Sequence, residues 1–199
     1  MRFALYAKEY NGINYMQKTI FIDRDGVINK DPGGWTKYSY VTKWDEFFFI
    51  DGSVKALQLL KDAGYKIFVI SNQGGISKGY FTQKDLDEVN RKMLIEIKKG
   101  GGKIDRLFYC IHHDKDNCEC RKPKTGLIEQ AAKTMRIDFK ETYIIGDSIR
   151  DVEAGKRIGM KTIFVSSGKT PLSELDSWGI KPDYIKKDLL EAVEWLLSK

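Results

Sequence analysis

The sequence predicts an α/β fold in which a mostly parallel sheet carries helices on both of its faces. Short apolar runs of β-branched and aromatic residues recur along the chain, and segments with apolar residues at helical spacing lie between them. Strands that are apolar along their whole length are typical of parallel sheets buried on both faces. Their alternation with helices is typical of the crossover connections that such a sheet requires.

The composition excludes several classes of protein. The chain has 199 residues, of which 42% are hydrophobic and 31% are charged. This composition is typical of ordinary globular domains and differs from that of disordered chains or of small domains held together by disulfide bonds. No apolar run approaches the roughly 18–20 residues that a membrane-spanning helix needs, and residues 1–18 lack the continuous apolar stretch of a secretory signal. We therefore expect a cytoplasmic protein with no membrane partner.

Charge and length indicate the kind of ligand and the number of domains. The net charge is +6, from 34 Lys and Arg residues against 28 Asp and Glu residues. The basic residues are spread along the chain, which favours a small acidic ligand such as phosphate over a nucleic acid. Residues 19–199 are predicted to form one domain, expected to be a monomer, behind an N-terminal extension, residues 1–18, whose role the sequence does not indicate.

The first part of the predicted fold contains two strands and one helix. Residues 19–22 form a β-branched and aromatic run that stops at an Asp-Arg-Asp-Gly turn. Residues 29–46 are rich in Gly, Pro, Trp and Tyr and are long for a plain connection, which predicts a functional loop. Residues 53–63 carry apolar side chains at helical spacing before Gly64, and the apolar run 66–70 predicts the next strand.

The middle of the chain continues this alternation. A helix is predicted to begin at Thr82, because Asp85 three positions later completes a capping-box pattern, and to end before the glycine run 100–102. A strand is predicted over 104–109. Residues 110–124 are polar and irregular, which indicates a loop before the next helix.

The last third of the chain is predicted to add three helices and two strands. The helices begin at about Thr125, at Ser148 and at Asp188; the first and last carry apolar residues at helical spacing, and the second has a capping-box pattern. The apolar runs 142–145 and 162–165 predict the two strands. The chain thus ends on an amphipathic helix.

Three carboxylates, a hydroxyl and a lysine are predicted to meet at one edge of the sheet. Asp23 and Asp25 follow the first predicted strand, Ser71 the second and Asp147 the fourth, and Lys122 lies in the loop after the third. Open α/β sheets bind ligands beyond the carboxyl ends of their strands, which is where these residues stand. Carboxylates suit Mg²⁺, and that ion neutralises phosphate oxygens, so the set predicts a phosphate and metal site.

These acids also have ordinary structural interpretations. Asp-x-Asp-Gly is a common turn sequence. Two acids directly after a buried strand are costly unless a cation offsets them, which favours a functional role for Asp23 and Asp25. Ser148 and Asp151 fit a capping box, so we predict Asp147 as the metal ligand and leave Asp151 as either a cap or a supporting group.

Three cysteines and a histidine form a second candidate site. Cys110, Cys118 and Cys120 lie within eleven residues, and His112 lies between them. Cysteines that form disulfide bonds between distant loops would be spread along the chain. Three thiolates and an imidazole are the ligand set of a closed tetrahedral Zn²⁺ site, with His113 as the alternative imidazole. Four protein ligands leave no position for a reacting water, so zinc here would be structural and would stiffen the loop.

These motifs resemble those of a known superfamily. Asp23-Arg24-Asp25-Gly26-Val27, Ser71-Asn72-Gln73, Lys122 and Gly146-Asp147 are similar, in order, to the four motifs of the haloacid dehalogenase superfamily of phosphohydrolases. Cys110-x-His112 followed by Cys118-x-Cys120-Arg121-Lys122-Pro123 resembles the zinc-bearing branch that acts on heptose bisphosphate and histidinol phosphate. The resemblance covers residues 20–165 and implies a Rossmann-like parallel sheet flanked by helices. The segments between the motifs are too short for a large cap domain.

The resemblance implies a role for each motif residue. Asp23 would be the nucleophile that forms an aspartyl-phosphate, and Asp25 would protonate the leaving group and then activate water. Mg²⁺ would be bound by Asp23, Asp147 and the backbone carbonyl of Asp25, while Ser71 and Lys122 stabilise the transferred phosphoryl group. The implied zinc ligands are Cys110, His112, Cys118 and Cys120, which leaves His113 to face solvent or ligand.

The resemblance also implies which residues contact substrate: Asp31, Pro32, Gly33 and Gly34 in the loop after the first strand, Asn72, Gln73 and Gly74 after the second, and Arg121. Residues 49–52 and 71–82 look more like the enzymes of heptose bisphosphate than those of histidinol phosphate, so a small phosphorylated sugar is the expected substrate. Two positions depart from the pattern. Ser71 replaces the commoner Thr and keeps the hydroxyl, and Gly74 replaces Ser and removes a possible phosphate contact.

Other functions fit the residues less well. A phosphorylation-dependent receiver module would need its acceptor Asp after a middle strand, where Ser71 stands, and its lysine last, whereas Lys122 is followed by Asp147. A nucleic-acid 3′-phosphatase would favour a basic stripe, which the spread of charge does not form. An ATP-dependent kinase of the P-loop type would need a Gly-x-x-x-x-Gly-Lys-Ser/Thr loop, which the sequence lacks.

Overall fold

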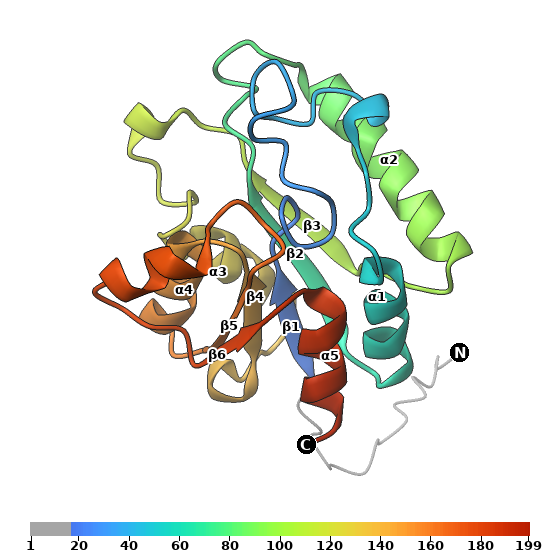
Figure 1. Cartoon of the computed structure of the whole chain (residues 1–199), viewed down its shortest axis with the longest axis vertical. Helices are drawn as coiled ribbons and strands as arrows, with labels where there is room; N and C mark the ends of the chain where they lie inside the picture. The colour runs from blue at the N-terminus through green and yellow to red at the C-terminus, as the bar shows by residue number, and fades with distance from the viewer. Residues whose placement is uncertain (1–16) are drawn as a thin grey trace, which may run out of the picture.

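The sheet has six parallel strands, which confirms the predicted fold class. The computed structural model describes residues 17–199, so the predicted extension, residues 1–18, lies almost entirely outside the described residues. The order across the sheet is β3-β2-β1-β4-β5-β6 (Figure 1). The strands are β1 (Thr19–Ile22), β2 (Lys66–Asn72), β3 (Arg106–Cys110), β4 (Tyr143–Gly146), β5 (Lys161–Val165) and β6 (Tyr184–Lys186).

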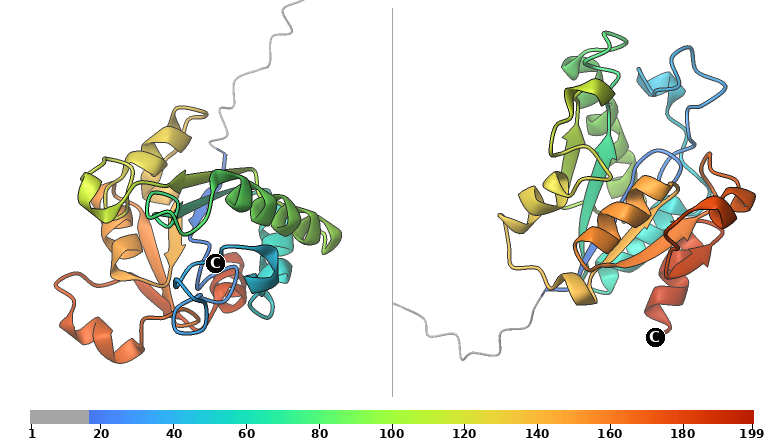
Figure 2. Two further views of the ribbon diagram at one scale, coloured as in Figure 1. Left: turned by 90° about the horizontal axis from the view of Figure 1, so that it is seen from above. Right: turned by 90° about the vertical axis from the view of Figure 1, so that its left-hand side faces the viewer.

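The α-helices of residues 17–199 cover both faces of this sheet (Figure 2). They are α1 (Ser53–Asp62), α2 (Gln83–Lys99), α3 (Gly126–Ala132), α4 (Ile149–Arg157) and α5 (Leu189–Leu197). Helices α1, α2 and α5 pack on the face that contains Ile22 and Val69, and α3 and α4 pack on the face that contains Phe21 and Ile70. Neighbouring residues of one strand therefore face opposite helical layers, which explains why the strands are apolar throughout.

Among residues 17–199, no helix is both long enough and apolar enough to cross a membrane.

The connections that follow β1, β2 and β3 lie at the same end of the sheet (Figures 1 and 2). They share this edge because the strands are parallel and their carboxyl ends lie together. The connection from β1 to α1 contains one short 3-10 helix, Trp44–Glu46, and the connection from β2 to α2 is limited to residues 73–82. Neither of these fully described connections builds a large cap domain, as the sequence predicts.

Most predicted elements agree with the structure, and the differences lie at their ends. The capping box predicted at Thr82 is present, with the backbone N–H of Asp85 donating to the Thr82 hydroxyl at 3.2 Å. Strand β2 continues past residue 70, because it pairs with β3 as far as Cys110. Helix α3 ends at Ala132, and Met135 packs against the same core from beyond its end.

The short edge strand β6 is absent from the sequence-based prediction because its three residues, Tyr-Ile-Lys, form no apolar run. The preceding Asp183 ties this strand to β5. Its carboxylate accepts hydrogen bonds from the backbone N–H of Thr162 at 2.7 Å and from the Thr162 hydroxyl at 2.9 Å, and it pairs with Lys156 of α4. Long-range polar contacts, rather than local hydrophobicity, therefore position β6.

Replacing Asp183 with Asn is expected to lower the free energy of unfolding by about 1 kcal/mol at neutral pH. Burial raises the pKa of Asp183, but hydrogen bonds from Lys156 and Thr162 outweigh burial and hold the pKa below its ordinary value of 3.8. The stabilisation is therefore present above the unfolded-state pKa and is lost as the pH falls through the folded-state pKa. Urea unfolding of both proteins at neutral and at strongly acidic pH checks this, and an equal difference at both would contradict it.

Candidate active site

The predicted catalytic residues meet where the strand order reverses. Strands β1 and β4 are neighbours at the centre of the sheet, and the chain continues from β1 to β2 on one side and from β4 to β5 on the other. Ligands of open α/β sheets bind at such a switch point. Asp23 directly follows β1, and its backbone N–H donates to the carbonyl of Ile145 in β4 at 2.9 Å. The motif therefore begins at the centre of this edge.

A cavity of about 110 Å³ opens at this point, and we call it the nucleophile cavity. The site residues predicted from the sequence that line it are Asp23, Asp25, Asp31, Pro32, Ser71, Asn72, Arg121, Lys122 and Asp147. Its other lining residues, which are not among the predicted site residues, are Ser39, Tyr40, Ser148, Arg150 and Lys169. The last three lie just after β4 or β5, so the rule that ligands bind at strand ends could have identified them.

Lys122 is buried beside two carboxylates. Its side-chain ammonium Nζ lies 2.9 Å from Asp23 Oδ2, 2.5 Å from Asp151 Oδ1 and 2.9 Å from the backbone carbonyl of Ile70. Burial by itself lowers the pKa of Lys122, but the Asp151 and Asp23 carboxylates outweigh burial and raise it. The ammonium is therefore held in its charged form against the Asp23 carboxylate.

Asp151 performs both of the roles that the sequence left open. Its Oδ2 accepts hydrogen bonds from the hydroxyl and the backbone N–H of Ser148, at 2.6 and 3.2 Å, and so caps the start of α4. Its Oδ1 accepts the hydrogen bond from Lys122. One carboxylate therefore fixes the first turn of α4 and the orientation of the lysine together.

Asp23 and Asp147 are acidic side chains that the fold buries close together. Burial raises the pKa of Asp23 to about 6; Lys122 opposes the rise, and the nearby Asp151 adds to it. Burial, with a contribution from the Asp23 charge, raises the pKa of Asp147 well above its ordinary value. Carboxylate oxygens of Asp23, Asp147 and Asp151 lie within 4.8 Å of one another. Such a buried group of carboxylates is stabilised by a cation between them, which fits Mg²⁺.

Two glycines leave room for the Asp147 carboxylate and for nothing larger. A Cβ atom at Gly26 would lie 2.5 Å from Asp147 Oδ2, and one at Gly168 would lie 1.9 Å from the same oxygen. Gly26 also has a φ of +82°, in the left-handed region that glycine favours. The backbone N–H of Lys169 donates to Asp147 Oδ2 at 3.1 Å. Close backbone packing therefore orients this carboxylate.

Replacing Gly168 with Ala is expected to lower the rate of phosphate release by about 100-fold, because misplacing a catalytic group by about 1 Å costs that much. The new Cβ would also lie 2.3 Å from Asp147 Cβ, which cannot move away unless the backbone moves. Phosphate release measured against Mg²⁺ concentration should show a raised requirement for the ion. Gly179→Ala is the matched control, since its Cβ would meet nothing within 4 Å. An unchanged Mg²⁺ requirement in Gly168→Ala would contradict this account.

The Asp25 carboxylate has a different environment from that of Asp23. The Arg24 guanidinium donates to both of its oxygens at 3.0 to 3.2 Å, the Asn29 amide donates at 2.8 Å and the Gln73 amide at 2.7 Å. Arg24 is fully buried and packs against the Tyr109 ring. The local sequence does not predict these contacts of Arg24 and Asn29, because they depend on how distant segments pack.

The side-chain amides of Asn72 and Gln73 both make hydrogen bonds to other site residues. Gln73 does not line the nucleophile cavity; its buried amide donates to Asp25 and, at 3.2 Å, to the hydroxyl of Ser71. Asn72 lines the cavity, but its side-chain amide exchanges two hydrogen bonds of 3.0 Å with the backbone of Lys122. Both residues therefore hold other site residues in position. Their contact with substrate stays a prediction.

The predicted glycine contacts also lie away from the nucleophile cavity. Gly74 packs against Arg121, whose Nη1 atom would lie 3.1 Å from a Cβ at that position. Gly33 and Gly34 are exposed in a turn where the backbone N–H of Gly33 donates to Asp31 Oδ1 at 2.8 Å. In this structure neither Gly74 nor the two turn glycines line the cavity, whereas Asp31 and Arg121 do.

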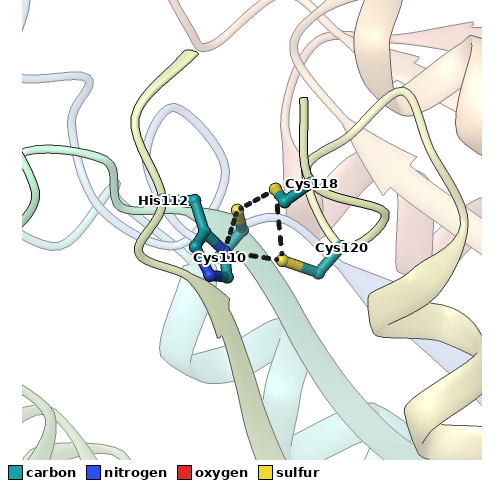
Figure 3. A group of neighbouring side chains, drawn as sticks. All are labelled: Cys110, His112, Cys118 and Cys120. Atoms are coloured by element: carbon teal, nitrogen blue, oxygen red, sulfur yellow. Dashed lines mark hydrogen bonds between the residues drawn. The ribbon is translucent and has the colours of Figure 1, made fainter. Parts of the chain in front are cut away.

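The predicted zinc ligands converge at the end of β3 (Figure 3). The Cys110 sulfur lies 3.5 Å from the Cys118 sulfur and 3.7 Å from His112 Nδ1. The Cys120 sulfur lies 3.5 Å from the Cys118 sulfur and 3.1 Å from His112 Nδ1. Four donor atoms on two short stretches of chain, 110–112 and 118–120, thus face a common centre.

The geometry of this cluster fits a zinc ion. In a tetrahedral site with Zn–S distances of about 2.3 Å and a Zn–N distance of about 2.0–2.1 Å, two sulfurs stand about 3.8 Å apart and a sulfur and a nitrogen about 3.5–3.6 Å apart, close to the observed separations. Burial raises the pKa of Cys110, and burial together with the neighbouring thiols raises the pKa of Cys120 to about 12, so a cation is needed for the thiols to ionise together. His113 stands outside the cluster, where its ring accepts the backbone N–H of Lys115 at 3.0 Å.

Comparison with known proteins agrees with this site. A profile of the HAD-hydrolase-like family matches residues 119–192. The chain is 40% identical over 166 residues to the D-glycero-beta-D-manno-heptose-1,7-bisphosphate 7-phosphatase of Pasteurella multocida, covering 80% of this chain and 86% of that protein. It is 41% identical over 152 residues to the protein of the same name from Neisseria meningitidis, covering 76% of this chain and 79% of that one.

A solved structure shows the same architecture. The D,D-heptose 1.7-bisphosphate phosphatase from B. bronchiseptica, solved in complex with magnesium and phosphate, superposes with a TM-score of 0.83 at 31% identity, covering 91% of this chain and 98% of that chain. The resemblance noted in the sequence is therefore confirmed over most of the chain. The chain belongs to the haloacid dehalogenase superfamily and, within it, to the family of heptose-bisphosphate phosphatases.

Proposed function

We propose that this phosphatase removes the 7-phosphate of D-glycero-D-manno-heptose 1,7-bisphosphate, with Asp23 as the nucleophile. The observation that carries the proposal is the pairing of Asp23 with the buried Lys122 at the switch point, in a chain 40% identical to a protein named for that reaction. We further propose that it works as a cytoplasmic monomer and supplies heptose precursors of lipopolysaccharide.

The first step is the attack of an Asp23 carboxylate oxygen on phosphorus. The new O–P bond forms as the bond from phosphorus to the sugar O7 breaks, which leaves an aspartyl-phosphate and a sugar hydroxyl once O7 has taken a proton. Lys122 and the hydroxyl of Ser71, both on the wall of the nucleophile cavity, stabilise negative charge on the transferred group. Asp151 keeps the lysine in position for this task.

Asp25 donates the proton that the sugar O7 takes in the first step, and it regains a proton in the second step. There, water attacks phosphorus, Asp25 accepts a proton from the water, and the O–P bond to Asp23 breaks to release phosphate and restore the carboxylate. Arg24, Asn29 and Gln73 together make five hydrogen bonds to the two oxygens of Asp25. An Asp25 oxygen that passes a proton to O7 or accepts one from water has to give up one of these hydrogen bonds and contact the substrate or the water instead.

Two metals fit the side chains. Asp23, Asp147 and the backbone carbonyl of Asp25 would hold Mg²⁺, which neutralises phosphate oxygens when it is bound. The zinc ligands Cys110, His112, Cys118 and Cys120 would cross-link the loop after β3. Arg121 directly follows the last of these ligands and lines the nucleophile cavity, so an ordered loop presents its guanidinium to the substrate.

Phosphorus NMR of the products tests the proposal. With Mg²⁺ and heptose 1,7-bisphosphate, we expect the 7-phosphate signal to be replaced by inorganic phosphate while the 1-phosphate signal persists. Histidinol phosphate, measured side by side, should be hydrolysed more slowly, and Asp23→Asn serves as the blank. Loss of the 1-phosphate, or faster hydrolysis of histidinol phosphate, would contradict the proposed substrate.

A further inference from the structure

Two charged residues join the connections that surround the nucleophile cavity. Asp114 lies in the loop after β3, at the start of the 3-10 helix Asp114–Asp116, and Lys78 lies in the connection between β2 and α2. Lys78 Nζ lies 3.4 Å from Asp114 Oδ2, although the two residues are 36 positions apart in the sequence. We call this pair the loop bridge, because each member also contacts a residue on the wall of the cavity.

On one side, the loop bridge holds Arg121. Asp114 Oδ1 pairs with Arg121 Nη2, and the Arg121 side chain is only 15% exposed. Its second terminal nitrogen, Nη1, is buried and has no hydrogen-bond partner among the described residues. A buried nitrogen in that state is costly, and an oxygen of the substrate would remove the cost. Asp114 therefore fixes the guanidinium and leaves one of its nitrogens available to a ligand.

On the other side, the loop bridge holds Tyr40, which lies in the connection between β1 and α1. Lys78 Nζ donates to the Tyr40 hydroxyl at 3.4 Å and lies 5.7 Å from the centre of its ring. Ser39 and Tyr40 both line the nucleophile cavity, and Ser39 has a φ of +55°, a sparsely populated value for a residue other than glycine. Such a conformation persists only where surrounding contacts hold it, so the placement of Tyr40 depends on its neighbours.

Aromatic contacts join two of the same connections. Tyr38 stacks on Tyr80 with ring centres 4.5 Å apart, and Tyr40 packs against Tyr80 and Phe81 at 6.0 and 5.9 Å. These rings tie the connection after β1 to the connection after β2, but none of them belongs to the loop after β3. The loop bridge adds a polar link from this aromatic group to Arg121.

We propose that Asp114 and Lys78 are positioning residues, which hold Arg121 and Tyr40 where the substrate meets them. Neither member of the loop bridge lines the nucleophile cavity, so both act through the residues that do. A guanidinium that is already held loses less conformational entropy when the substrate binds, which lowers KM without changing the chemical step. The inference rests on the proposed function only in taking Arg121 and Tyr40 as walls that the substrate contacts.

The sign of the change in KM separates positioning from simple electrostatics. Removing the negative charge of Asp114 makes the site more attractive to a phosphate ester, so electrostatics alone predicts a lower KM for Asp114→Ala. Positioning predicts the opposite. We expect KM for heptose 1,7-bisphosphate to rise about fivefold, as when one long side chain has to be ordered on binding, with kcat within about twofold of wild type. Asp114→Glu should recover part of the loss.

Asp116→Asn is the matched control. Asp116 lies in the same 3-10 helix and carries the same charge, but its carboxylate accepts the backbone N–H of His113 at 2.7 Å, a bond that an Asn oxygen can keep. This variant loses the charge and keeps the loop bridge, so its KM should stay the same or fall slightly. Because ion pairs with an exposed partner contribute little to stability, the thermal midpoints of both variants should lie within about 4 °C of wild type.

A double-mutant cycle tests whether the loop bridge acts as one unit. Lys78→Met should also raise KM, since it frees Tyr40 and leaves Asp114 with a single partner. In the double variant with Asp114→Ala, the rise should be clearly smaller than the product of the two single rises, because the second substitution breaks a bridge that is already broken. Lys84→Met, at an exposed position of α2, is the control for the loss of a lysine and should leave KM unchanged.

Chemical modification of Arg121 measures the positioning without turnover. An arginine-specific dicarbonyl reagent should modify Arg121 slowly in wild type and several-fold faster in Asp114→Ala, as followed by mass spectrometry of the peptide that contains it. Arg91 is exposed on α2 and pairs with Glu88, so its modification should proceed at the same rate in both proteins.

The outcomes separate this inference from the proposed function. A KM that falls or stays unchanged in Asp114→Ala, a multiplicative double variant or an unchanged modification rate of Arg121 would each overturn the positioning role, although the phosphatase activity stands. If wild type releases no phosphate from heptose 1,7-bisphosphate, the proposed function fails. The same cycle with histidinol phosphate then decides the positioning role, because either ester has to enter the cavity whose walls include Arg121 and Tyr40.

Discussion

Replacing Asp23 with Asn is expected to abolish phosphate release, by at least about 10⁴-fold, while the fold stays intact. The carboxylate oxygen that would attack phosphorus becomes an amide, which is a poor nucleophile. The backbone N–H of Arg24 donates to Asp23 Oδ1 at 2.7 Å, and an Asn side chain offers an oxygen for the same bond. Phosphate release under saturating Mg²⁺ is the measurement, with Asp62→Asn, an exposed position on α1, as the control.

The stability of Asp23→Asn gives a second, independent check. In the metal-free protein, burial and the neighbouring Asp151 carboxylate raise the pKa of Asp23 to about 6, which means that the ionised form is disfavoured in the fold. A neutral amide removes that cost, and Lys122 keeps Asp151 as its partner. The thermal midpoint in the presence of a chelator should therefore equal or exceed that of wild type. Activity close to wild type, or a large drop in the midpoint, would contradict the role assigned to Asp23.

Replacing Cys118 with Ser is expected to remove bound zinc, to lower stability and to reduce activity together. The loop after β3 has few buried apolar residues of its own, and the four ligand side chains link its two ends. Because zinc binding contributes to folding, we expect the free energy of unfolding to fall by at least about 3 kcal/mol, or roughly 6–12 °C in thermal midpoint for a chain of this length. Zinc content by elemental analysis and thermal unfolding measure the effect.

His113→Asn is the matched control for the zinc site. His113 is adjacent to the ligand His112 but lies outside the cluster, where its ring accepts the backbone N–H of Lys115. This variant should keep its zinc and lose little stability. A strong chelator should lower the midpoint of wild type and of His113→Asn while leaving Cys118→Ser unchanged. Full zinc content in Cys118→Ser would show that the cluster does not hold the metal as proposed.

The parts of this protein that the sequence predicts are those that local chemistry determines. The apolar runs of β1, β2, β4 and β5 become strands that are buried on both faces. Asp23 and Asp147 lie at the carboxyl edge because they directly follow β1 and β4. The capping box at Thr82 and the cap at Ser148 need only residues within one helical turn. The zinc ligands likewise lie within eleven residues, so their spacing alone identifies the group.

The parts that the sequence does not predict depend on contacts between distant segments. Strand β6 is held by Asp183 and not by apolar residues of its own. The buried amide of Gln73 donates to Asp25, and this contact joins residues 48 positions apart in the sequence. Arg150 and Arg157 form a common surface with Arg121 only because α4 lies beside the loop after β3. The residue pattern of a single segment cannot predict these contacts, because each of them joins two distant segments.

Chemical trapping at Asp23 tests the central claim most directly. Borohydride added during turnover of heptose 1,7-bisphosphate reduces an acyl phosphate to the alcohol, so a carboxylate that carries the phosphoryl group is converted to homoserine. We expect mass spectrometry to locate homoserine at position 23, only when substrate and Mg²⁺ are both present, and never in Asp23→Asn. Homoserine at position 25 or 147, or none at all while phosphate is being released, would contradict the assignment of Asp23 as the nucleophile.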